Sequence, residues 1–450
     1  MKVTGKKFSI LGAAKSGLAA SEALIKQGAS VFISDIQPEP ALLGILQKAG
    51  LGASVEFEAG GHTEKVLDAD YIVVSPGVRS DLPLLKKAEE KNIPYFSEIE
   101  LAYRLTSGKR IAITGSNGKT TTTTLIARLC ETNFPSVFLG GNIGIPVANF
   151  IGKTTPDSAQ IIEISSFQLE TIRDFKPDVA VITNFYENHL DRYATYQEYI
   201  DAKKNIYKNM TADDWLVLNG NQPIMLEIAQ EAHCRIAWFG KPLLNSSPSL
   251  TTQDSHFIYT DSQNKQTKLF PVSAVKLLGE HNIENVMCAL LAAILAGTDP
   301  ERTEEPVTTF GGVEHRLEWV HEKDGRIFIN DSKGTNCKAS ETALKACNQP
   351  IILLAGGRDK GTRLSDWVQT VRNRAKKVIL FGEAANRFRA ALEGQIPLKT
   401  VKNLEQAIKT AYDESEKGDT ILLSPACSSY DEFSNFEERG DFFKKTVKAL

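Results

Sequence analysis

Residues 110–120 read RIAITGSNGKT and join an apolar run to a glycine-containing turn and a threonine-rich segment. The apolar run predicts a buried strand, and the threonines predict the start of a helix. Such a strand–turn–helix unit can cradle phosphate, because glycines let backbone N–H groups point to one centre and a helix N-terminus adds roughly half a positive charge. Lys119 can reach the outer phosphates and Thr120 can ligate Mg²⁺.

The turn differs from the common GxxxxGK[ST] loop, because Ile113 stands where that loop has its first glycine. The strand before it and the helix after it still favour a phosphate site over a plain loop. The sequence therefore predicts ATP binding. The residues expected to contact ATP in this segment are Gly115, Ser116, Asn117, Gly118, Lys119, Thr120 and Thr121.

The length of 450 residues exceeds what one hydrophobic core usually serves and predicts three domains of about 100–200 residues each. The 52 basic and 55 acidic side chains give a net charge of −3, and without a polybasic run this argues against a nucleic-acid partner. No apolar run approaches the roughly 20 residues of a membrane span, and Lys15 interrupts the only N-terminal run that resembles a signal peptide. We therefore expect a cytoplasmic protein.

Six cysteines without a CxxC pair predict reduced thiols rather than a zinc site or a disulfide framework.

The N-terminal unit, residues 1–95, predicts a Rossmann-like domain. A strand at 8–11, a small-residue turn, a helix and a second strand follow one another, and Asp35 then stands where a ribose-binding carboxylate would. Ala14 replaces the glycine that normally lets the backbone approach a pyrophosphate, so two interpretations stay open: a nicotinamide site, or an α/β domain that uses this turn for another ligand. A second small-residue turn, at 75–77, is expected at the same edge of the sheet.

The middle unit, residues 96–310, predicts a P-loop ATPase-like domain with a parallel or mixed sheet, because β-branched strands alternate with helices. Glu163 lies inside the apolar strand at 160–165, where an unpaired carboxylate is expensive to bury. Metal ligation is one explanation, and an ion pair with a lysine is the other. His189 and Asp191, taken alone, are more often loop or helix-cap residues than ligands.

The C-terminal unit, residues 311–450, again alternates strands with helices and predicts a second Rossmann-like α/β domain. Polar loops follow three of its strands, and parallel strands bring such loops to one rim of a sheet. Each loop by itself is rich in ordinary turn formers. The loops lie at 331–336, 356–361 and 424–431.

Nine segments of this chain occur together, in the same order and with similar spacing, in the Mur ligase family. They are TGSNGKTTTT, GGNIG, EISSFQLE, NHLDRY, GEHNIEN, GGVEHR, NDSKGTN, GGRDKG and SPACSSYDEFSNFEERG. The resemblance covers essentially the whole chain, and NDSKGTN with the last segment is its most specific part. The chain departs from the family pattern at Ala14 and at 186–188, where Tyr-Glu-Asn replaces a more acidic run.

The resemblance implies an ATP-dependent, ADP-forming acid–D-amino-acid ligase. It would add D-glutamate to UDP-N-acetylmuramoyl-L-alanine through an acyl phosphate, in the cytoplasmic synthesis of peptidoglycan precursors, and so serve cell-wall formation, cell shape and cell division. Two Mg²⁺ ions, with Mn²⁺ as an alternative, are implied as cofactors, and we expect a monomer. A nicotinamide-dependent dehydrogenase, a non-catalytic nucleotide switch and a Mur-type ligase for another amino acid remain the alternatives.

The resemblance also implies roles for individual residues. Lys119, Glu163, His189 and Lys203 would be catalytic, and the metal ligands would be Thr120, Glu163, His189 and Lys203. Lys203 would act as a carbamylated lysine, although its place in the sequence alone predicts an ordinary cation on a helix surface. Further ATP contacts would come from Asn282, Asn285, Arg316 and Asp331. The UDP-substrate would contact Ser16, Asp35, Gly77, Asn142 and His189, and D-glutamate would contact Thr335, Lys360, Ser429, Tyr430 and Phe436.

Overall fold

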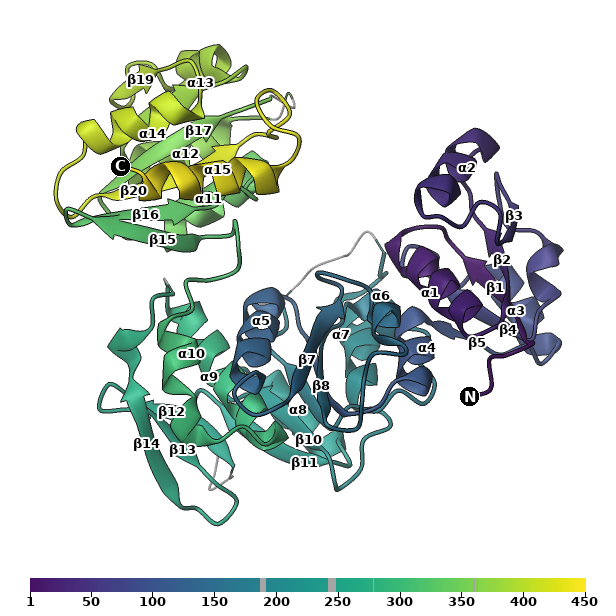
Figure 1. Ribbon diagram of the computed structural model, residues 1–450. Coiled ribbons are helices and arrows are strands. Elements are labelled where there is room, and N and C mark those ends of the chain that lie inside the picture. The colour runs from purple at the N-terminus through teal and green to yellow at the C-terminus, as the bar shows by residue number, and fades with distance from the viewer. Residues whose placement is uncertain (187–191, 242–247, 278, 359–360, 362) are drawn as a thin grey trace. The chain divides into compact units, whose positions relative to one another are not determined.

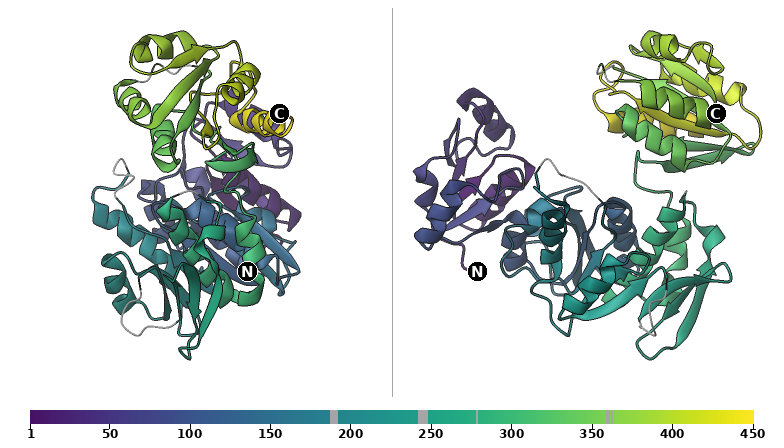
Figure 2. Two further views of the ribbon diagram at one scale, coloured as in Figure 1. Left: turned by 90° about the vertical axis from the view of Figure 1, so that its left-hand side faces the viewer. Right: turned by 180° about the vertical axis from the view of Figure 1, so that it is seen from behind.

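A computed structural model describes residues 1–186, 192–241, 248–277, 279–358, 361 and 363–450. The described chain forms two compact units, one of Met1–Val272 with Glu284–Val307 and one of Ser273–Ile283 with Thr308–Leu450. Two sheets lie in the first unit and one in the second (Figure 1; Figure 2). Each sheet carries helices, so the predicted α/β class with three sheet-containing domains is confirmed.

The N-terminal sheet, purple in Figure 1, is parallel and has the strand order β3-β2-β1-β4-β5. Its strands are β1 (Lys7–Leu11), β2 (Ser30–Ser34), β3 (Glu56–Glu58), β4 (Tyr71–Val74) and β5 (Tyr95–Ser97). The helices are α1 (Lys15–Lys26), α2 (Glu39–Lys48), α3 (Pro83–Glu90) and the 3₁₀ turn η1 (Glu64–Leu67). The central strand β1 is apolar because both of its faces are covered, and Phe8 and Ile10 are fully buried.

The central sheet is mixed and has the order β14-β13-β12-β11-β10-β9-β6-β8-β7, in which only β13 and β14 run antiparallel to their neighbours. Its strands are β6 (Lys109–Thr114), β7 (Ser136–Gly141), β8 (Ser158–Glu163), β9 (Val179–Ile182), β10 (Trp215–Asn219), β11 (Arg235–Phe239), β12 (Ser249–Gln253), β13 (His256–Thr260) and β14 (Gln266–Pro271). The helices that accompany it are α4 (Glu98–Leu105), α5 (Lys119–Cys130), α6 (Ser166–Leu169), α7 (Tyr196–Lys204), α8 (Ile224–Glu231), α9 (Glu280–Ala296) and α10 (Glu304–Thr308). The apolar strand predicted before the phosphate turn is β6, which lies inside the sheet between β8 and β9.

The C-terminal sheet has the order β15-β16-β20-β17-β18-β19 and is parallel except for the edge strand β15. Its strands are β15 (Glu318–Lys323), β16 (Arg326–Asn330), β17 (Ile351–Gly356), β18 (Ala375–Phe381), β19 (Leu398–Thr400) and β20 (Thr420–Ala426). Its helices are α11 (Cys337–Ala346), α12 (Ser365–Arg374), α13 (Ala385–Leu392), α14 (Leu404–Asp413) and α15 (Phe436–Lys448). Alternate strand residues serve two separate cores, with Leu353 packed among α11–α13 and Leu354 packed among α14 and α15. The sheet is therefore covered on both faces, as a doubly wound domain requires.

Within the described part of the chain, no helix combines the length and the apolar character that crossing a membrane requires.

Candidate active site

At two positions in the turn between β6 and α5, the backbone has a conformation that only glycine fits. Gly115 has a φ of +138°, and a Cβ there would lie 2.0 Å from Oγ1 of Thr183. Gly118, at the N-cap of α5, has a φ of +78°, and a Cβ there would lie 2.2 Å from Oδ1 of Asn285. The two glycines thus let the turn pass close to its neighbours and lead directly into the N-terminus of α5, which is the arrangement of a phosphate cradle.

Hydrogen bonds hold this turn against the segment after β9. The Ser116 hydroxyl donates to the carbonyl of Tyr186 at 2.9 Å and accepts from the N–H of Tyr186 at 2.9 Å. The backbone N–H of Asn117 donates to Oδ1 of Asn184 at 2.9 Å, and Thr183 Oγ1 donates to the Asn117 carbonyl at 2.7 Å. The cradle is therefore shaped before any ligand binds.

Lys119 lies over the turn. Its Nζ donates to the carbonyls of Gly115 and Ser116, both at 2.9 Å. The ammonium group is thus held at the mouth of the cradle, where a bound phosphate would accept its protons in place of these carbonyls. Thr120 and Thr121 follow in the first turn of α5, and both are half-buried.

Glu163 ends β8 beside the phosphate strand, and its side chain is 1% exposed. One carboxylate oxygen, Oε1, accepts from Nδ2 of Asn142 at 2.7 Å, which brings the two predicted site residues together. The other oxygen, Oε2, is buried and has no hydrogen-bond partner among the described residues. A buried carboxylate oxygen without a partner is costly, and a cation is the ligand that would satisfy it. The ion pair with a lysine that the sequence left open does not occur within the described ranges.

Lys203 is not on the surface, so the expectation from its place in the sequence was wrong. Its side chain is 2% exposed, with Nζ 3.4 Å from Oγ1 of Thr114 and 4.7 Å from the ring centroid of Tyr199. The reason is the helical period: Tyr199, Ile200 and Lys203 share the face of α7 that packs inward. That spacing is the signal that could have revealed the burial.

Burial and the charge of Lys119 together hold the pKa of Lys203 well below its usual range, and the negative charge of Glu163 opposes them only in part. Low dielectric disfavours the ammonium form, since no carboxylate in the described part of the chain lies at ion-pair distance from Nζ. Burial thus makes loss of the Nζ proton easier than it is for an exposed lysine.

His189, the remaining predicted metal ligand, lies outside the described residues, as does Asp191. Within the described part, no three His, Cys, Asp or Glu side chains gather as a metal site. Asn285, predicted to contact ATP, is buried against the cradle, with its Oδ1 3.5 Å from Oγ1 of Thr122. Asn282 lies near the start of α9, where its backbone N–H donates to the Gly279 carbonyl at 2.9 Å.

A second cluster lies at the carboxyl edge of the N-terminal sheet. Gly12 has a φ of +92°, and its carbonyl accepts from the Ser75 hydroxyl at 3.0 Å. Asp35 is buried, and its two oxygens accept from the N–H groups of Ala13 at 2.6 Å and Gln37 at 2.8 Å. The two predicted turns therefore meet at one edge together with Asp35, whose carboxylate holds the turn before α1, the helix that carries Ser16 in its first turn. Gly77 follows in the second turn and is exposed.

The three polar loops of the C-terminal sheet converge as predicted, because β16, β20 and β17 are neighbours. Oδ2 of Asp331 accepts from the Ser424 hydroxyl at 2.7 Å, and the N–H of Arg358 donates to the Ser428 carbonyl at 2.9 Å. Burial raises the pKa of Asp331 to about 7, against the lowering effect of the Ser424 hydrogen bond. Arg316, predicted to contact ATP, is exposed.

The residues predicted for D-glutamate come from all three of these loops and from the start of α15. Ser429 is buried, Thr335 is half-buried and Tyr430 is 59% exposed. Phe436 opens α15, and its carbonyl accepts from the Ser332 hydroxyl at 2.8 Å. Lys360, the predicted cation of this site, lies outside the described residues.

Three family models match the chain in sequence order. They describe a Mur ligase MurD-like N-terminal domain over residues 6–97, a Mur ligase middle domain over 113–293 and a Mur ligase glutamate ligase domain over 315–427. A relative from Clostridioides difficile, named UDP-N-acetylmuramoylalanine--D-glutamate ligase, is 38% identical over 454 residues, which cover 100% of both chains. The chain belongs to the Mur ligase family. It is therefore an ATP-dependent, ADP-forming amide ligase, from a family that generally uses Mg²⁺.

Further Mur ligases agree with this assignment. Relatives from Acidobacterium capsulatum and Geobacillus kaustophilus, with the same name as the first, are 40% and 39% identical and cover 100% and 99% of this chain and 97% and 98% of their own. A solved UDP-N-acetylmuramate-alanine ligase from Thermotoga maritima is 18% identical, with a TM-score of 0.54 and 99% of both chains covered. A solved UDP-N-acetylmuramoyl-L-alanyl-D-glutamate--2,6-diaminopimelate ligase is 18% identical, with a TM-score of 0.58, covering 99% of this chain and 92% of its own. These two structures share the fold.

Sequence reasoning missed one buried cation of this Mur ligase, Arg439. Its side chain is 1% exposed, Nε donates to the Ser332 hydroxyl at 2.9 Å, and Nη2 donates to the carbonyls of Ser332 at 2.8 Å and Cys427 at 3.2 Å. Burial lowers the pKa of Arg439 to about 10. The guanidinium thus joins two of the polar loops, the one at 331–336 through Ser332 and the one at 424–431 through Cys427. The signal was available in the sequence, because Arg439 shares the inward face of α15 with Phe443 and Val447.

We expect Arg439→Met to destabilise the C-terminal unit by about 2–4 kcal/mol, because charged hydrogen bonds are lost and buried carbonyls stay unpaired. Thermal unfolding of the variant would show this as a lower melting temperature. Arg372→Met is a matched control, because Arg372 lies in the last turn of α12 and is exposed. An unchanged melting temperature in Arg439→Met would contradict the anchoring role.

Proposed function

We propose that this Mur ligase joins the amino group of D-glutamate to the alanyl carboxylate of UDP-N-acetylmuramoyl-L-alanine, with ATP converted to ADP and phosphate. A carboxylate is a poor electrophile at neutral pH, so ATP first phosphorylates it to an acyl phosphate. The amine of D-glutamate then attacks the carbonyl carbon, and phosphate leaves. The names of the full-length relatives support this substrate pair.

One observation carries the assignment of the reaction centre. A glycine cradle with a lysine over its mouth lies beside a buried carboxylate that has an unsatisfied oxygen. Lys119 would hold the β- and γ-phosphates, and the N–H groups of 115–121 would fix the nucleotide in line with its acceptor. Catalysis of phosphoryl transfer needs little beyond such positioning and charge neutralisation.

We infer that two Mg²⁺ ions bind at this site, and the unsatisfied Oε2 of Glu163 supports a cation there. Thr120 would hold one ion, and Glu163, His189 and Lys203 would hold the other. Mg²⁺ supplies neutralisation of the phosphate charge and orientation of the reacting oxygens. Mn²⁺ prefers the same donors and is the alternative.

Lys203 would reach this role as a carbamate. Its neutral amine adds to the carbon of CO₂, and the nitrogen loses a proton, so that the side chain ends in an anionic carboxylate. The support is geometric, because the amine is buried beside Thr114, and an anionic oxygen there would give a hard cation the ligand that an ammonium cannot.

We assign three domains, at 1–95, 96–310 and 311–450. The first would bind the uridine nucleotide through Ser16, Asp35 and Gly77, and the second would add Asn142 and His189 near the muramoyl and alanyl groups. Asn282, Asn285, Arg316 and Asp331 would complete the ATP site. D-Glutamate would bind the third domain through Thr335, Lys360, Ser429, Tyr430 and Phe436. We place the reaction in the cytoplasm, because its substrates are ATP and a UDP-linked nucleotide, and we expect the chain to act as a monomer.

The test is phosphate release from ATP with UDP-N-acetylmuramoyl-L-alanine and a panel of amino acids. We expect turnover with D-glutamate and little with L-glutamate, L-alanine or L-lysine. With both carboxylates of L-glutamate held by the same partners, its amine would point away from the acyl phosphate. Lys360→Met should raise the D-glutamate KM by about 10- to 100-fold and leave the ATP KM largely unchanged, because a charged hydrogen bond to a desolvated carboxylate is lost.

Equal turnover with another amino acid would favour a Mur ligase of different specificity. Phosphate release that no amino acid stimulates would favour a nucleotide switch, and tight NADH binding would favour a dehydrogenase.

A further inference from the structure

Two charged residues of the segments EISSFQLE and NHLDRY have no part in the proposed chemistry. They are Glu170 and Arg192, whose side chains form an ion pair with 2.8 Å between Oε2 and Nη2. Both are largely buried, with 12% and 15% of the side chains exposed. A buried ion pair is poor evidence of stabilisation, because the desolvation of two charges offsets their attraction. Its other contacts therefore decide what it does.

Arg192 holds a loop of the N-terminal sheet on both sides of Gly77. Nη1 donates to the carbonyl of Pro76 at 3.1 Å, and Nη2 lies 3.5 Å from the carbonyl of Val78. The guanidinium carbon lies 4.2 Å from the ring centroid of Phe167, so the face of the group packs on α6. One planar side chain thus joins the loop at 76–78 to the central sheet's helices.

Glu170 closes the network from the other side. Its Oε2 accepts from the Ser80 hydroxyl at 2.7 Å, and its Oε1 accepts from the Tyr193 hydroxyl at 2.7 Å. Burial and this hydrogen bond raise the pKa of Tyr193, so the phenol keeps its proton and donates. We call Ser80, Glu170, Arg192 and Tyr193 the Glu170 clamp.

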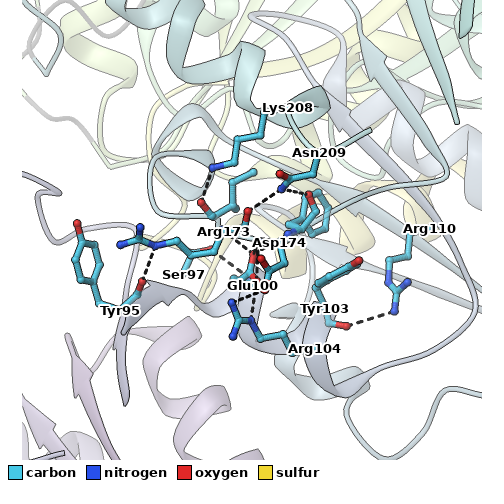
Figure 3. Close-up of polar contacts among 12 residues, drawn as sticks. Tyr95, Ser97, Glu100, Tyr103, Arg104, Arg110, Arg173, Asp174, Lys208 and Asn209 are labelled. Carbon is cyan, nitrogen blue, oxygen red and sulfur yellow. Dashed lines mark hydrogen bonds and ion pairs between the residues drawn. The ribbon is translucent and has the colours of Figure 1, made fainter. Parts of the chain in front are cut away.

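The segment that carries Glu170 is itself fixed in place, because the residues after Glu170 are hydrogen-bonded to Glu100 of α4 (Figure 3). Glu100 is fully buried, and its carboxylate accepts from the N–H groups at 173–175 at 2.8–3.1 Å and from Nε of Arg104 at 2.7 Å. Lys208 adds a hydrogen bond to the Ile172 carbonyl at 2.6 Å. The segment that carries Glu170 is therefore tied to the central sheet independently of the clamp.

We propose that Arg192 and Glu170 are positioning residues. They hold the loop at 76–78, which contains Gly77, in the position that binds the uridine nucleotide of the substrate, and they keep this loop at a fixed distance from the phosphate cradle. The inference rests on the proposed function, since Gly77 is there assigned to the UDP-substrate. Neither residue touches the reacting atoms. Their effect should therefore fall on binding of the nucleotide substrate and spare ATP.

We expect Arg192→Ala to raise the KM for UDP-N-acetylmuramoyl-L-alanine by about 10- to 100-fold, because its two hydrogen bonds to the loop carbonyls and its ion pair with Glu170 are lost. The KM for ATP and kcat should stay within about threefold, since the variant removes binding that ground state and transition state share. Arg192→Lys should recover only part of the loss, because an ammonium cannot reach the carbonyls of Pro76 and Val78 and the carboxylate together.

Two milder variants can still test the role of the clamp if Arg192→Ala folds poorly. Ser80→Ala and Glu170→Gln each remove one contact of the clamp and should raise the same KM by smaller factors. Combined with Arg192→Lys, Glu170→Gln should cost less than the product of the two separate effects, because both act on one pair. Arg79→Ala is the matched control: Arg79 lies in the same loop, is 61% exposed and forms its ion pair with Asp81 at 2.6 Å. It should change no KM.

Turnover by the wild-type protein distinguishes failure of the proposed function from failure of the Glu170 clamp. If the wild-type protein does not turn over the nucleotide substrate with D-glutamate, the proposed function fails. If it does, and Arg192→Ala and Ser80→Ala leave the nucleotide KM unchanged, the clamp is wrong. Equal increases in the KM for ATP and for the nucleotide substrate would also overturn it, because they indicate a general structural defect.

Discussion

Lys203→Ala is expected to lower turnover by about 10³-fold, because the carbamate that would complete the metal site cannot form. Formate or acetate should restore part of the activity, since a small carboxylate can occupy the vacated space beside Thr114. The fold should survive. The removed Nζ makes one long hydrogen bond, to Oγ1 of Thr114 at 3.4 Å, and one contact with the Tyr199 ring, so little stability depends on it.

Steady-state phosphate release with and without added formate is the measurement, together with a melting temperature. Lys204→Ala is a matched control, because the next residue of α7 pairs with Glu231 at the helix surface. We expect its turnover to stay near that of the wild type. Full activity of Lys203→Ala without added acid would rule out the carbamate.

Lys119→Ala is expected to lower turnover by about 10²-fold or more, because the cation at the β- and γ-phosphates is lost at the point where negative charge develops. The variant also loses two hydrogen bonds, from Nζ to the carbonyls of Gly115 and Ser116. The turn should keep its shape, since Ser116, Asn117 and Thr183 hold it independently of this lysine.

Lys109 offers a matched control for Lys119, the first residue of α5. Lys109 begins β6, is 39% exposed and pairs with Asp178 at 3.4 Å, so Lys109→Ala should leave turnover unchanged. Single-turnover phosphate release in both variants would separate loss of chemistry from loss of ATP binding. Near-normal turnover of Lys119→Ala at an unchanged melting temperature would mean that the phosphate cradle is assigned wrongly.

The predictions that were confirmed rest on local patterns in the sequence. The phosphate turn was readable because strand, glycines and lysine are adjacent in the chain, and backbone geometry alone fixes their arrangement. The convergence of the three C-terminal loops was readable for a topological reason, since parallel strands place their carboxyl ends at one edge. The roles assigned to all individual site residues, and the domain bounds, remain predictions.

The sequence by itself determined the α/β class, the phosphate turn and the edge of each sheet at which polar loops gather, because hydrophobic period and turn chemistry are properties of neighbouring residues. Only the tertiary structure decided which polar side chains are buried and which partners they meet. Lys203, Arg439 and the pair of Glu170 with Arg192 read as ordinary charges along the chain. Their environment depends on the elements that pack against them from distant parts of the sequence, and packing of that kind fixes both burial and pKa.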